Sequence, residues 1–525
     1  MSDGSILAEV VRHGLQAVAE EMGAALIRTA HSVNIRDRRD FSCGVFDEKA
    51  RLVAQAEHIP VHLGLLAGVV GRVVEDLGAD VSAGTMIVTN DPWLTGSHLP
   101  DVVVIAPVDH EGVRLGYVAN MAHQVDLGGM APGSLALGTT EVMQEGLRVP
   151  PTVLMRGGTV ERSTLRLFEL ASRTPDVVAG DLLAQAAANE RGAARLAELV
   201  SRTGHDRFSE AIETLVAATE RRVEAELLKL GDCQSAFEDV LEWSEQGRPV
   251  DLSIRASVRV SNGRLTVDFT GTAGQVAGPV NAPRFLTTSC VLYAVKALLD
   301  PEIASNDGLF AQIDVVTPER SIVDAAAPAP VALCTSITSQ RITDALIGAF
   351  NVLSPERAIA ASTGSMNALI MGGRDESTGR AYSYVETYGG GQGGLPGMNG
   401  ADGVHCHMTN TANSPVEFIE REYPLTVLNY ALVENSGGAG EFAGGRGLTR
   451  TIRLESDAVV TVHLDRTRHR PWGVHGGEAG GHSRLVVEED GKTRKLAGKS
   501  TTSLKKGAVL TIATAGGGGW GKAKA

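Results

Sequence analysis

The sequence has few cysteines, few aromatic residues and no long apolar run. Its 5 cysteines are spread over 525 residues and form no C-x-x-C pair. An odd and scattered set favours free thiols in a reducing compartment, so we predict no disulfide framework. No apolar stretch approaches the roughly 18 residues that a membrane helix needs, and the first residues lack the basic and apolar regions of a secretory signal. These absences predict a cytoplasmic protein without a membrane span.

Positive charge and nucleotide-binding motifs are also scarce. The chain carries 48 Lys+Arg against 62 Asp+Glu, and its formal net charge of −14 disfavours nonspecific binding to nucleic acid. The basic residues between 492 and 506 lack interleaved aromatic side chains and fit a solvated sheet face. Neither a G-x-x-x-x-G-K-[ST] loop nor a G-x-S-x-G elbow is present. We therefore expect no nucleic acid partner, no recognisable ATP site in this chain and no serine nucleophile.

Glycine, in contrast, is abundant, with 61 residues. Many glycines gather in four clusters late in the chain, at 389–394, 437–447, 473–481 and 516–521. The clusters alternate with patterned strand segments and lack the Pro, Ser and Gln bias of a disordered tail. They therefore predict tight turns and close packing of backbone against backbone.

Apolar residues recur at two different periods along the chain. A period near that of a helix predicts helices over residues 5–30, 62–77, 181–201, 207–230, 285–299 and 339–351. Alternating residues predict hairpins over 40–55 and 252–269, the second of which turns at Asn262-Gly263. Residues 450–514 are predicted to be mostly strands.

Two H-x-x-D units, His98–Asp101 and His123–Asp126, carry the strongest chemical signal in the sequence. Predicted strands precede both units, so the first unit is expected on a loop and the second where a strand meets a loop. Imidazole nitrogens and carboxylate oxygens bind divalent ions, and three ligands from this set would leave positions open for water or substrate. The alternative is a set of separate polar residues, with each histidine making hydrogen bonds in the core.

Two other histidine groups give weaker signals. His58 and His62 are four residues apart, but Pro60 between them opposes the helical geometry that would align their imidazoles. This pair is a candidate for lining a pocket. The His-Cys-His run at 405–407 would alternate faces in a strand and has no second ligand pair, so we interpret it as incidental.

Many stretches of the chain resemble one known family. In order they are Asp40 to Cys43, His58 to Gly64, Asn90 to Pro92, Ser97 to Asp101, Ala122-His123, Asp126 to Gly129, Pro132 to Ser134, Gln144 to Pro151, Gly180 to Gln185, Asp268 to Thr272, Asn413 to Glu417, Asn435 to Gly440 and Gly516 to Gly521. These blocks span essentially the whole chain and resemble the hydantoinase B family. That family includes the B subunits of N-methylhydantoinases, the C-terminal half of 5-oxoprolinases and subunits of acetone and acetophenone carboxylases.

The resemblance implies a metal-bearing subunit that works beside a hydantoinase A-type partner, an ATPase that binds the ATP. It implies that His98, Asp101 and His123 are metal ligands, with Asp40 a weaker candidate for a further ligand. Many members have His-His in the second motif, whereas this chain has His123-Gln124. If the family ligand is the second histidine, the assignment at this position fails. A mixed set of nitrogen and oxygen ligands suits Mn²⁺ or Zn²⁺.

The resemblance also implies a division of the chemistry between two subunits. The partner is expected to use ATP to phosphorylate the carbonyl oxygen of an inert lactam or ketone. For a lactam, a metal ion in this chain would lower the pKa of bound water and supply hydroxide, with Asp126 as the general base or an orienting group. Asp91 is a candidate to hold the imidazoles in place. We favour such an ATP-dependent lactam hydrolase, with a hydantoin, 5-oxoproline or a larger lactam as substrate. The alternatives are a ketone carboxylase subunit and, in another class, a noncatalytic scaffold for the ATPase.

Helical and strand patterns together predict a mixed α+β fold. A chain of this length accommodates two to four domains or one large composite. We predict a metal-bearing N-terminal α/β region over 1–248, a mixed α/β region over 249–434 and a β-rich, glycine-rich region over 435–525. One composite hydantoinase B-type domain is the alternative to this division.

Overall fold

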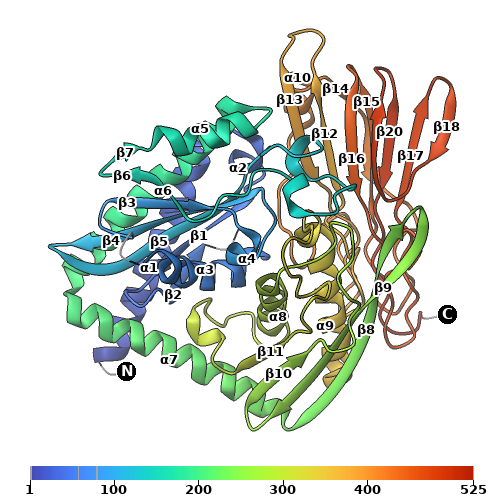
Figure 1. Ribbon diagram of the computed structural model, residues 1–525. Helices are drawn as coiled ribbons and strands as arrows, with labels where there is room; N and C mark the ends of the chain where they lie inside the picture. The colour runs from blue at the N-terminus through green and yellow to red at the C-terminus, as the bar shows by residue number, and fades with distance from the viewer. Residues whose placement is uncertain (1–2, 57, 79–80, 524–525) are drawn as a thin grey trace.

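The computed structural model describes residues 3–56, 58–78 and 81–523, and its fold is mixed α+β, as predicted (Figure 1). Figure 1 shows the blue and cyan N-terminal elements on one side of the molecule and the orange and red C-terminal strands on the other. The helices and strands of the middle of the chain lie below and between them.

The N-terminal part is built on a seven-stranded antiparallel sheet in the order β2-β1-β5-β4-β3-β6-β7. Its strands are β1 (Phe41–Phe46), β2 (Leu52–Ala56), β3 (Thr85–Thr89), β4 (Asp101–His110), β5 (Val113–His123), β6 (Thr152–Arg156) and β7 (Thr159–Val160). Helices α1 (Asp3–Thr29) and α6 (Pro175–Thr203) cover one face, and α3 (His62–Leu77) packs against the other. The short helices are α2 (Val33–Arg36), α4 (Pro92–Thr95) and α5 (Arg162–Ala171).

Strand β4 shows how this sheet is buried on both sides. Its β-branched run gives a strand in which alternate side chains point to opposite faces. Val102 and Val104 belong to the core formed with α1 and α6, whereas Val103 and Ile105 belong to the core that includes α3. Two hydrophobic layers therefore hold the sheet in place.

The middle of the chain extends the second of these cores. Helix α7 (His205–Leu230) leads into a sheet of β8 (Cys233–Glu245), β9 (Arg248–Ser261), β10 (Arg264–Asp268) and β11 (Ile313–Val316), in which only the β10–β11 pair is parallel. Helices α8 (Arg284–Leu299) and α9 (Ser339–Leu353) pack between this sheet and α3. One hydrophobic core thus crosses the predicted boundary at 248/249. The division into three regions stays a prediction, and the shared core favours the composite alternative.

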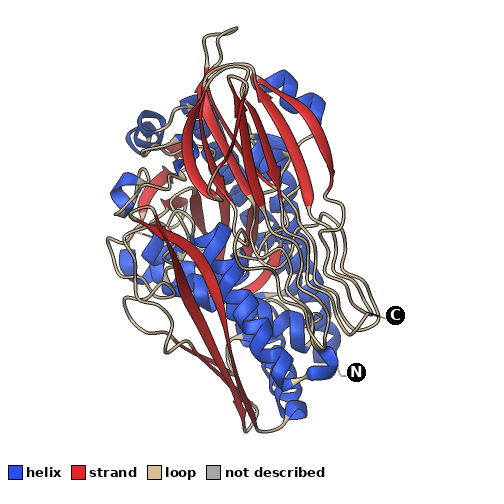
Figure 2. Cartoon of the chain, turned by 90° about the vertical axis from the view of Figure 1, so that its right-hand side faces the viewer, coloured by secondary structure: helices blue, strands red, loops and turns tan. Residues whose placement is uncertain are grey.

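Two sheets form the C-terminal part and share one hydrophobic core (Figures 1 and 2). One consists of β12 (Ala368–Arg374), β13 (Ala381–Thr387), β16 (Ala458–His463) and β19 (Lys499–Leu504). The other consists of β14 (Leu425–Leu432), β15 (Leu448–Leu454), β17 (Arg484–Glu489), β18 (Lys492–Lys495) and β20 (Val509–Ala513), and α10 (Val416–Glu422) precedes it. The predicted β-rich character of residues 450–514 is confirmed.

The glycine clusters lie in loop segments that run together beside this pair of sheets (Figure 2). Segments from different clusters pair through their backbones, as in the hydrogen bond from Gly391 N to Ala515 O at 3.0 Å. A Cβ added to Gly391 would lie 2.0 Å from Gly445 O, where no side chain fits. The predicted close backbone packing is confirmed. The predicted tight turns are mostly wrong, because among the described glycines of these clusters only Gly476 and Gly521 have a left-handed φ.

Most predicted helices occur at or near their predicted bounds. Helix α3 has the predicted bounds, whereas α6 begins at Pro175 rather than at residue 181. Sequence patterning missed α5, which is a short helix with a narrow apolar face against α6. Over the stretches that the structure describes, no helix has the length and apolarity needed to cross a membrane.

Candidate metal centre

Three strand ends bring the two H-x-x-D units together at one edge of the N-terminal sheet. Strand β5 lies between β1 and β4, and the β4–β5 register pairs Asp101 directly with His123. Asp40 immediately precedes β1, and its carbonyl oxygen accepts a hydrogen bond from His123 N at 3.0 Å. His98 precedes β4 by three residues and lies on a loop, as predicted. The loop placement of Asp101 is wrong, because the ladder with β5 extends to this residue.

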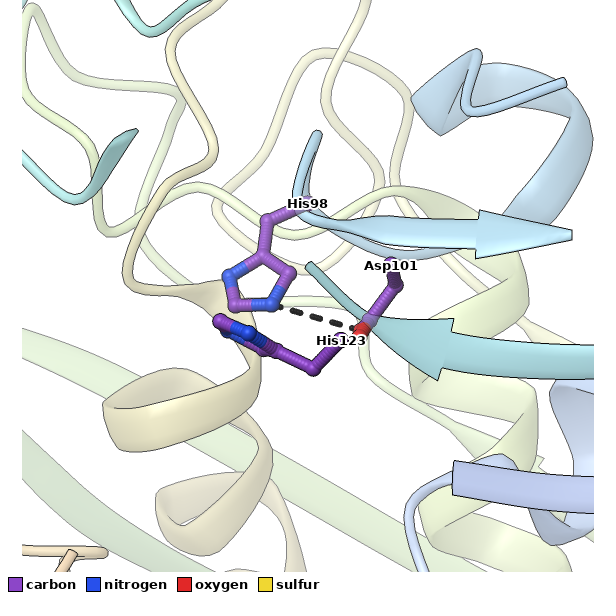
Figure 3. Close-up of side chains that lie close together, drawn as sticks. All are labelled: His98, Asp101 and His123. Atoms are coloured by element: carbon purple, nitrogen blue, oxygen red, sulfur yellow. Dashed lines mark ion pairs between the residues drawn. The ribbon is translucent and has the colours of Figure 1, made fainter. Parts of the chain in front are cut away.

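His98, Asp101 and His123 form a compact buried cluster (Figure 3). Each offers one ligand atom, and these atoms lie within 4.8 Å of one another. His98 Nε2 is 3.3 Å from Asp101 Oδ2, and the two imidazole rings meet edge to face with their centroids 5.0 Å apart. The structure therefore brings together three of the four predicted metal ligands as a single group.

The His98 ring is held by a backbone carbonyl on the far side of the cluster. Its Nδ1 lies 3.0 Å from Ala332 O and 3.3 Å from Thr335 Oγ1. A carbonyl oxygen only accepts, so in the neutral imidazole Nδ1 carries the proton and Nε2 presents its lone pair to the cluster. This is the orientation that a metal-binding histidine requires.

Two polar atoms of the cluster have no hydrogen-bond partner among the described residues. His98 Nε2 and Asp101 Oδ1 are buried and make no hydrogen bond with any described residue. Buried polar atoms without partners cost free energy, so native proteins rarely keep them without a reason. A cation between the imidazoles and the carboxylate would satisfy both atoms, and the mixed donor set fits a divalent transition-metal ion.

Burial and mutual attraction set the charges in the cluster. Burial lowers the pKa of His98, but the attraction of Asp101 outweighs it and the net shift is upward. Burial raises the pKa of Asp101, yet the charge of His98 and a hydrogen bond from His62 hold it well below its usual value. Burial lowers the pKa of His123. An ionised carboxylate and a readily neutral imidazole are the forms that bind a cation.

Asp40 lies in the cavity that the cluster lines, but it is not part of the compact group. The wall of this cavity includes Asp40, His98, Asp101 and His123. Asp40 is half-buried, whereas the three clustered residues are buried. Its role as a further ligand stays a prediction.

Asp126, the predicted general base, does not line this cavity. Its carboxylate is fully buried and accepts hydrogen bonds from Gly128 N at 2.9 Å, Gly133 N at 2.8 Å and Arg173 N at 3.1 Å. The Arg173 guanidinium also pairs with it at 3.2 Å. These are the contacts of a carboxylate that organises the loop after β5. They give no support to a role in proton transfer.

Gln124 and Asp91 also point away from the cluster. Gln124 Nε2 donates to Gln185 Oε1 of helix α6 at 2.9 Å, on the face of the sheet opposite α3. The difference from a His-His motif therefore lies outside the cluster of His98, Asp101 and His123. Asp91 caps α4 through Trp93 N at 3.0 Å and pairs with Arg148 at 2.7 Å, so it does not hold the imidazoles.

Three side chains around the cluster were not predicted as site residues. His62 stands at the start of α3. Its Nε2 is 3.8 Å from Asp101 Oδ2, and its Nδ1 is 3.2 Å from Ser42 Oγ. Glu145 accepts a hydrogen bond from Ala332 N at 2.9 Å and so holds the residue whose carbonyl oxygen orients His98. Burial raises the pKa of Glu145 to about 7. Arg38 lines the cavity.

Of these three residues, only His62 had a signal in the sequence, namely its four-residue spacing from His58. The two side chains line different pockets, because His62 begins α3 and reaches the metal cavity, whereas His58 precedes the helix. His58 stacks on Phe41, with ring centroids 4.4 Å apart. His62 alone reaches the cavity.

A family model described as Hydantoinase B/oxoprolinase matches residues 4–523. The chain belongs to the hydantoinase B/oxoprolinase family. It is 34% identical over 538 residues to 5-oxoprolinase 1 of Arabidopsis thaliana, covering 98% of this chain and 41% of that protein. It is 39% identical over 519 residues to an uncharacterized protein of Methanocaldococcus jannaschii, covering 98% of this chain and 90% of that protein. The chain thus spans about two fifths of the plant relative and most of the archaeal one.

Two further matches come from bacteria. A Pseudomonas protein named as a subunit of a D-/L-hydantoinase is 30% identical over 506 residues, with 94% of this chain and 85% of that protein covered. The crystal structure of the ATP-dependent caprolactamase from Pseudomonas jessenii superposes with a TM-score of 0.92 at 26% identity, covering 99% of this chain and 91% of that one. An acetone carboxylase structure shares the fold, with a TM-score of 0.88 at 17% identity over 98% of this chain and 76% of that one. The predicted family is confirmed, and it is a family of enzymes.

Proposed function

We propose that this chain is the metal-bearing subunit of an ATP-dependent cyclic amide hydrolase. In this proposal a hydantoinase A-type partner binds ATP and phosphorylates the carbonyl oxygen of a lactam, and hydrolysis is completed in the cavity beside His98, Asp101 and His123. The names of the relatives support the reaction class, since they include 5-oxoprolinases, a hydantoinase and a caprolactamase. One of these relatives is named as a single subunit of its hydantoinase, which supports a partner.

The observation that carries the proposal is the buried donor set with unsatisfied atoms. His98 Nε2 and Asp101 Oδ1 make no hydrogen bond within the described chain, and both residues belong to the group whose ligand atoms lie within 4.8 Å of one another. A scaffold protein has no physical need for such a set. We assign His98, Asp101 and His123 as the metal ligands and Asp40 as a fourth, with Zn²⁺ or Mn²⁺ as the ion. When bound, the ion would supply Lewis acidity toward the substrate carbonyl and toward water.

The surrounding residues act by holding this set in position. The Ser97 hydroxyl donates to Asp101 Oδ2, and His62 Nε2 lies near the same oxygen. Asp101 Oδ1 therefore remains available to bind a metal ion. Ala332 O fixes the tautomer of His98. Apolar side chains of the cavity wall, such as Met366 and Leu135, limit the access of bulk water.

A ketone carboxylase subunit remains the second candidate. It is supported only by the shared fold with acetone carboxylase. In that reaction the same cavity would bind bicarbonate or carbon dioxide and an enolate oxygen, so the proposed metal ligands would be the same. The substrate therefore has to be determined by assay.

The test is to purify the chain together with its ATPase partner, to measure bound metal, and to assay ATP hydrolysis with lactams and, separately, with ketones plus bicarbonate. We expect ring opening of a lactam without incorporation of bicarbonate carbon into the product. Incorporation of that carbon would favour the carboxylase instead. His98→Ala should lose both metal and turnover, and Asp40→Asn should lower metal occupancy; full occupancy in His98→Ala would contradict the ligand assignment.

A further inference from the structure

Arg38 is a fully buried arginine in the wall of the metal cavity. Its Nη1 donates to Asn34 Oδ1 at 3.0 Å and to Val385 O, and its Nη2 donates to Thr387 Oγ1 at 3.3 Å. All three acceptors are neutral. Among the described residues no carboxylate forms an ion pair with this guanidinium, so a full positive charge is buried without a counter-charge of its own.

The other large buried arginines of the described chain are all paired. Arg450 contacts Glu386 at 2.8 Å, Arg341 contacts Asp465 at 2.7 Å, and Arg466 contacts two aspartates at 2.8 Å each. A buried charge is costly unless an opposite charge and hydrogen bonds offset the loss of water. Among these four arginines of the described chain, Arg38 is therefore the one without an ion-paired carboxylate, although Asp40 and Asp101 line the same cavity.

The guanidinium of Arg38 retains unused hydrogen-bond donors. Its Nε is buried and has no partner, and Nη2 makes one hydrogen bond. A guanidinium carries five N–H groups, of which three are used here, so two remain. Paired N–H groups of this kind bind two oxygens of one carboxylate or phosphate group.

Hydroxyl and amide groups connect Arg38 to the metal cluster. Thr387 Oγ1, which accepts from Arg38, also contacts Thr411 Oγ1, and both threonines line the cavity. Asn34 accepts from Arg38 and places its Nδ2 3.4 Å from His123 Nδ1. An anion held by Arg38 would thus lie in the same cavity as a substrate at the metal cluster.

We propose that Arg38 binds an oxyanion of the activated substrate, and that this oxyanion is the phosphoryl group. The inference rests on the proposed function, in which every substrate arrives phosphorylated whatever ring it carries. A phosphoryl group offers two oxygens to the free donors of Arg38 and a further oxygen to the hydroxyls beside it. A carboxylate group of the substrate would also offer two oxygens to Arg38. The experiment distinguishes binding of a phosphoryl group from binding of a carboxylate.

The experiment is calorimetric titration of the full chain with inorganic phosphate and with acetate, with and without bound Zn²⁺. The variants are Arg38→Gln, which removes the charge, Arg38→Lys, which keeps the charge but not the paired donors, and Arg36→Gln. Arg36 is the matched control, because it lies two residues away, pairs with Asp37 at 3.0 Å and does not line the cavity. Bound metal is measured for every variant.

We expect phosphate to bind the native chain and the Arg36 control equally, Arg38→Gln to bind it at least tenfold more weakly, and Arg38→Lys to fall between. Equal phosphate affinity in Arg38→Gln, or no phosphate binding to the native chain, overturns the inference. Tighter binding of acetate than of phosphate overturns the phosphoryl assignment. If Arg38→Gln does not fold, the rise of Tm with phosphate in the native chain and in Arg38→Lys decides the question. A chain that binds phosphate through Arg38 but binds no metal would contradict the metal site of the proposed function, whereas it would support Arg38 as the oxyanion-binding residue.

Discussion

Arg341 and Arg38 are both fully buried, yet their electrostatic surroundings differ completely. Arg341 belongs to what we call the closed network, which has equal numbers of cations and carboxylates: Arg341, Arg466, Lys499, Asp239, Asp344 and Asp465. Arg38 belongs to what we call the open cavity, together with Asp40, His98, Asp101 and His123, where the guanidinium has no ion pair and Arg38 Nε, His98 Nε2 and Asp101 Oδ1 have no hydrogen-bond partner among the described residues. Arg341 Nε, Arg466 Nε and Asp344 Oδ1 of the closed network also lack hydrogen-bond partners, so the two regions differ in ion pairing: each cation of the closed network pairs with a carboxylate, whereas Arg38 has no ion pair among the described residues.

The position of the closed network explains its balance. Asp239 lies on β8, Arg341 on α9, and Arg466 follows β16, so the network joins the middle of the chain to the C-terminal sheets. Its ion pairs hold these elements together. The open cavity lies where the edge of the N-terminal sheet meets β13 and residues 409–411. The comparison leads to four predictions, given from the largest expected effect to the smallest.

Removal of a ligand should abolish function in the open cavity. His98→Ala in the complex with the ATPase partner is expected to lose bound metal and to reduce turnover by at least about a hundredfold, because the ion supplies the main electrostatic stabilisation. The measurements are metal content per chain and turnover with a lactam. His469→Ala is the control, since this partly exposed imidazole pairs with Asp251 at 2.8 Å and does not line the cavity. Unchanged metal content in His98→Ala would contradict the assignment of His98 as a metal ligand of the open cavity.

Neutralisation of a buried arginine should have different effects in the two regions. Arg341→Met leaves carboxylates of the closed network unpaired and is expected to cost about 3–5 kcal/mol of the free energy of unfolding. Arg38→Met removes an uncompensated charge together with three neutral hydrogen bonds, so its effect on the metal-free chain is expected to stay within about 1–2 kcal/mol. Urea unfolding of both variants measures the difference. Equal losses would show that Arg38 is as well compensated as Arg341.

Asp126 should behave as a structural carboxylate outside the open cavity. Asp126→Asn weakens the charged hydrogen bonds to Gly128, Gly133 and Arg173 and is expected to lower the free energy of unfolding by about 1–3 kcal/mol. Metal content and the pH dependence of turnover are expected to stay as in the native chain. Loss of the limb of the pH profile that reports the general base would instead support Asp126 as that base.

His405 should make the wall beside the open cavity sensitive to acid. Burial, reinforced by the charge of Arg38, lowers its pKa from 6.5 to about 4. The folded state therefore holds it neutral while the unfolded chain takes up a proton, so its contribution to stability is complete above pH 6.5 and is lost as the pH falls toward 4. The loss is expected to be about 1–3 kcal/mol, seen as a steeper fall of unfolding free energy with pH in the native chain than in His405→Gln. Parallel curves for the two proteins would contradict this.

The elements of the candidate site could be predicted from the sequence better than its chemistry. The loop position of His98 before β4 and the position of His123 at the end of β5 could be predicted, because β-branched runs and turn residues are local signals. Asp126 ends an H-x-x-D unit with the same spacing as the unit that ends at Asp101, yet its carboxylate accepts hydrogen bonds from Gly128 N and Gly133 N. Equal spacing along the chain does not make two side chains equivalent, because the direction of each depends on its own backbone and neighbours.

The sequence by itself determined the family, the mixed fold class, most helices and strands, and the residue types that can bind a cation. Each of these depends on local periodicity, on turn residues or on ordered sequence stretches that resemble the family. Only the tertiary structure decided which polar residues share a cavity and which are already satisfied. The β4–β5 register sets Asp101 opposite His123, and a chain segment more than two hundred residues later supplies Ala332 O to orient His98. Such choices rest on long-range packing and on the balance of buried charge, which no local pattern records.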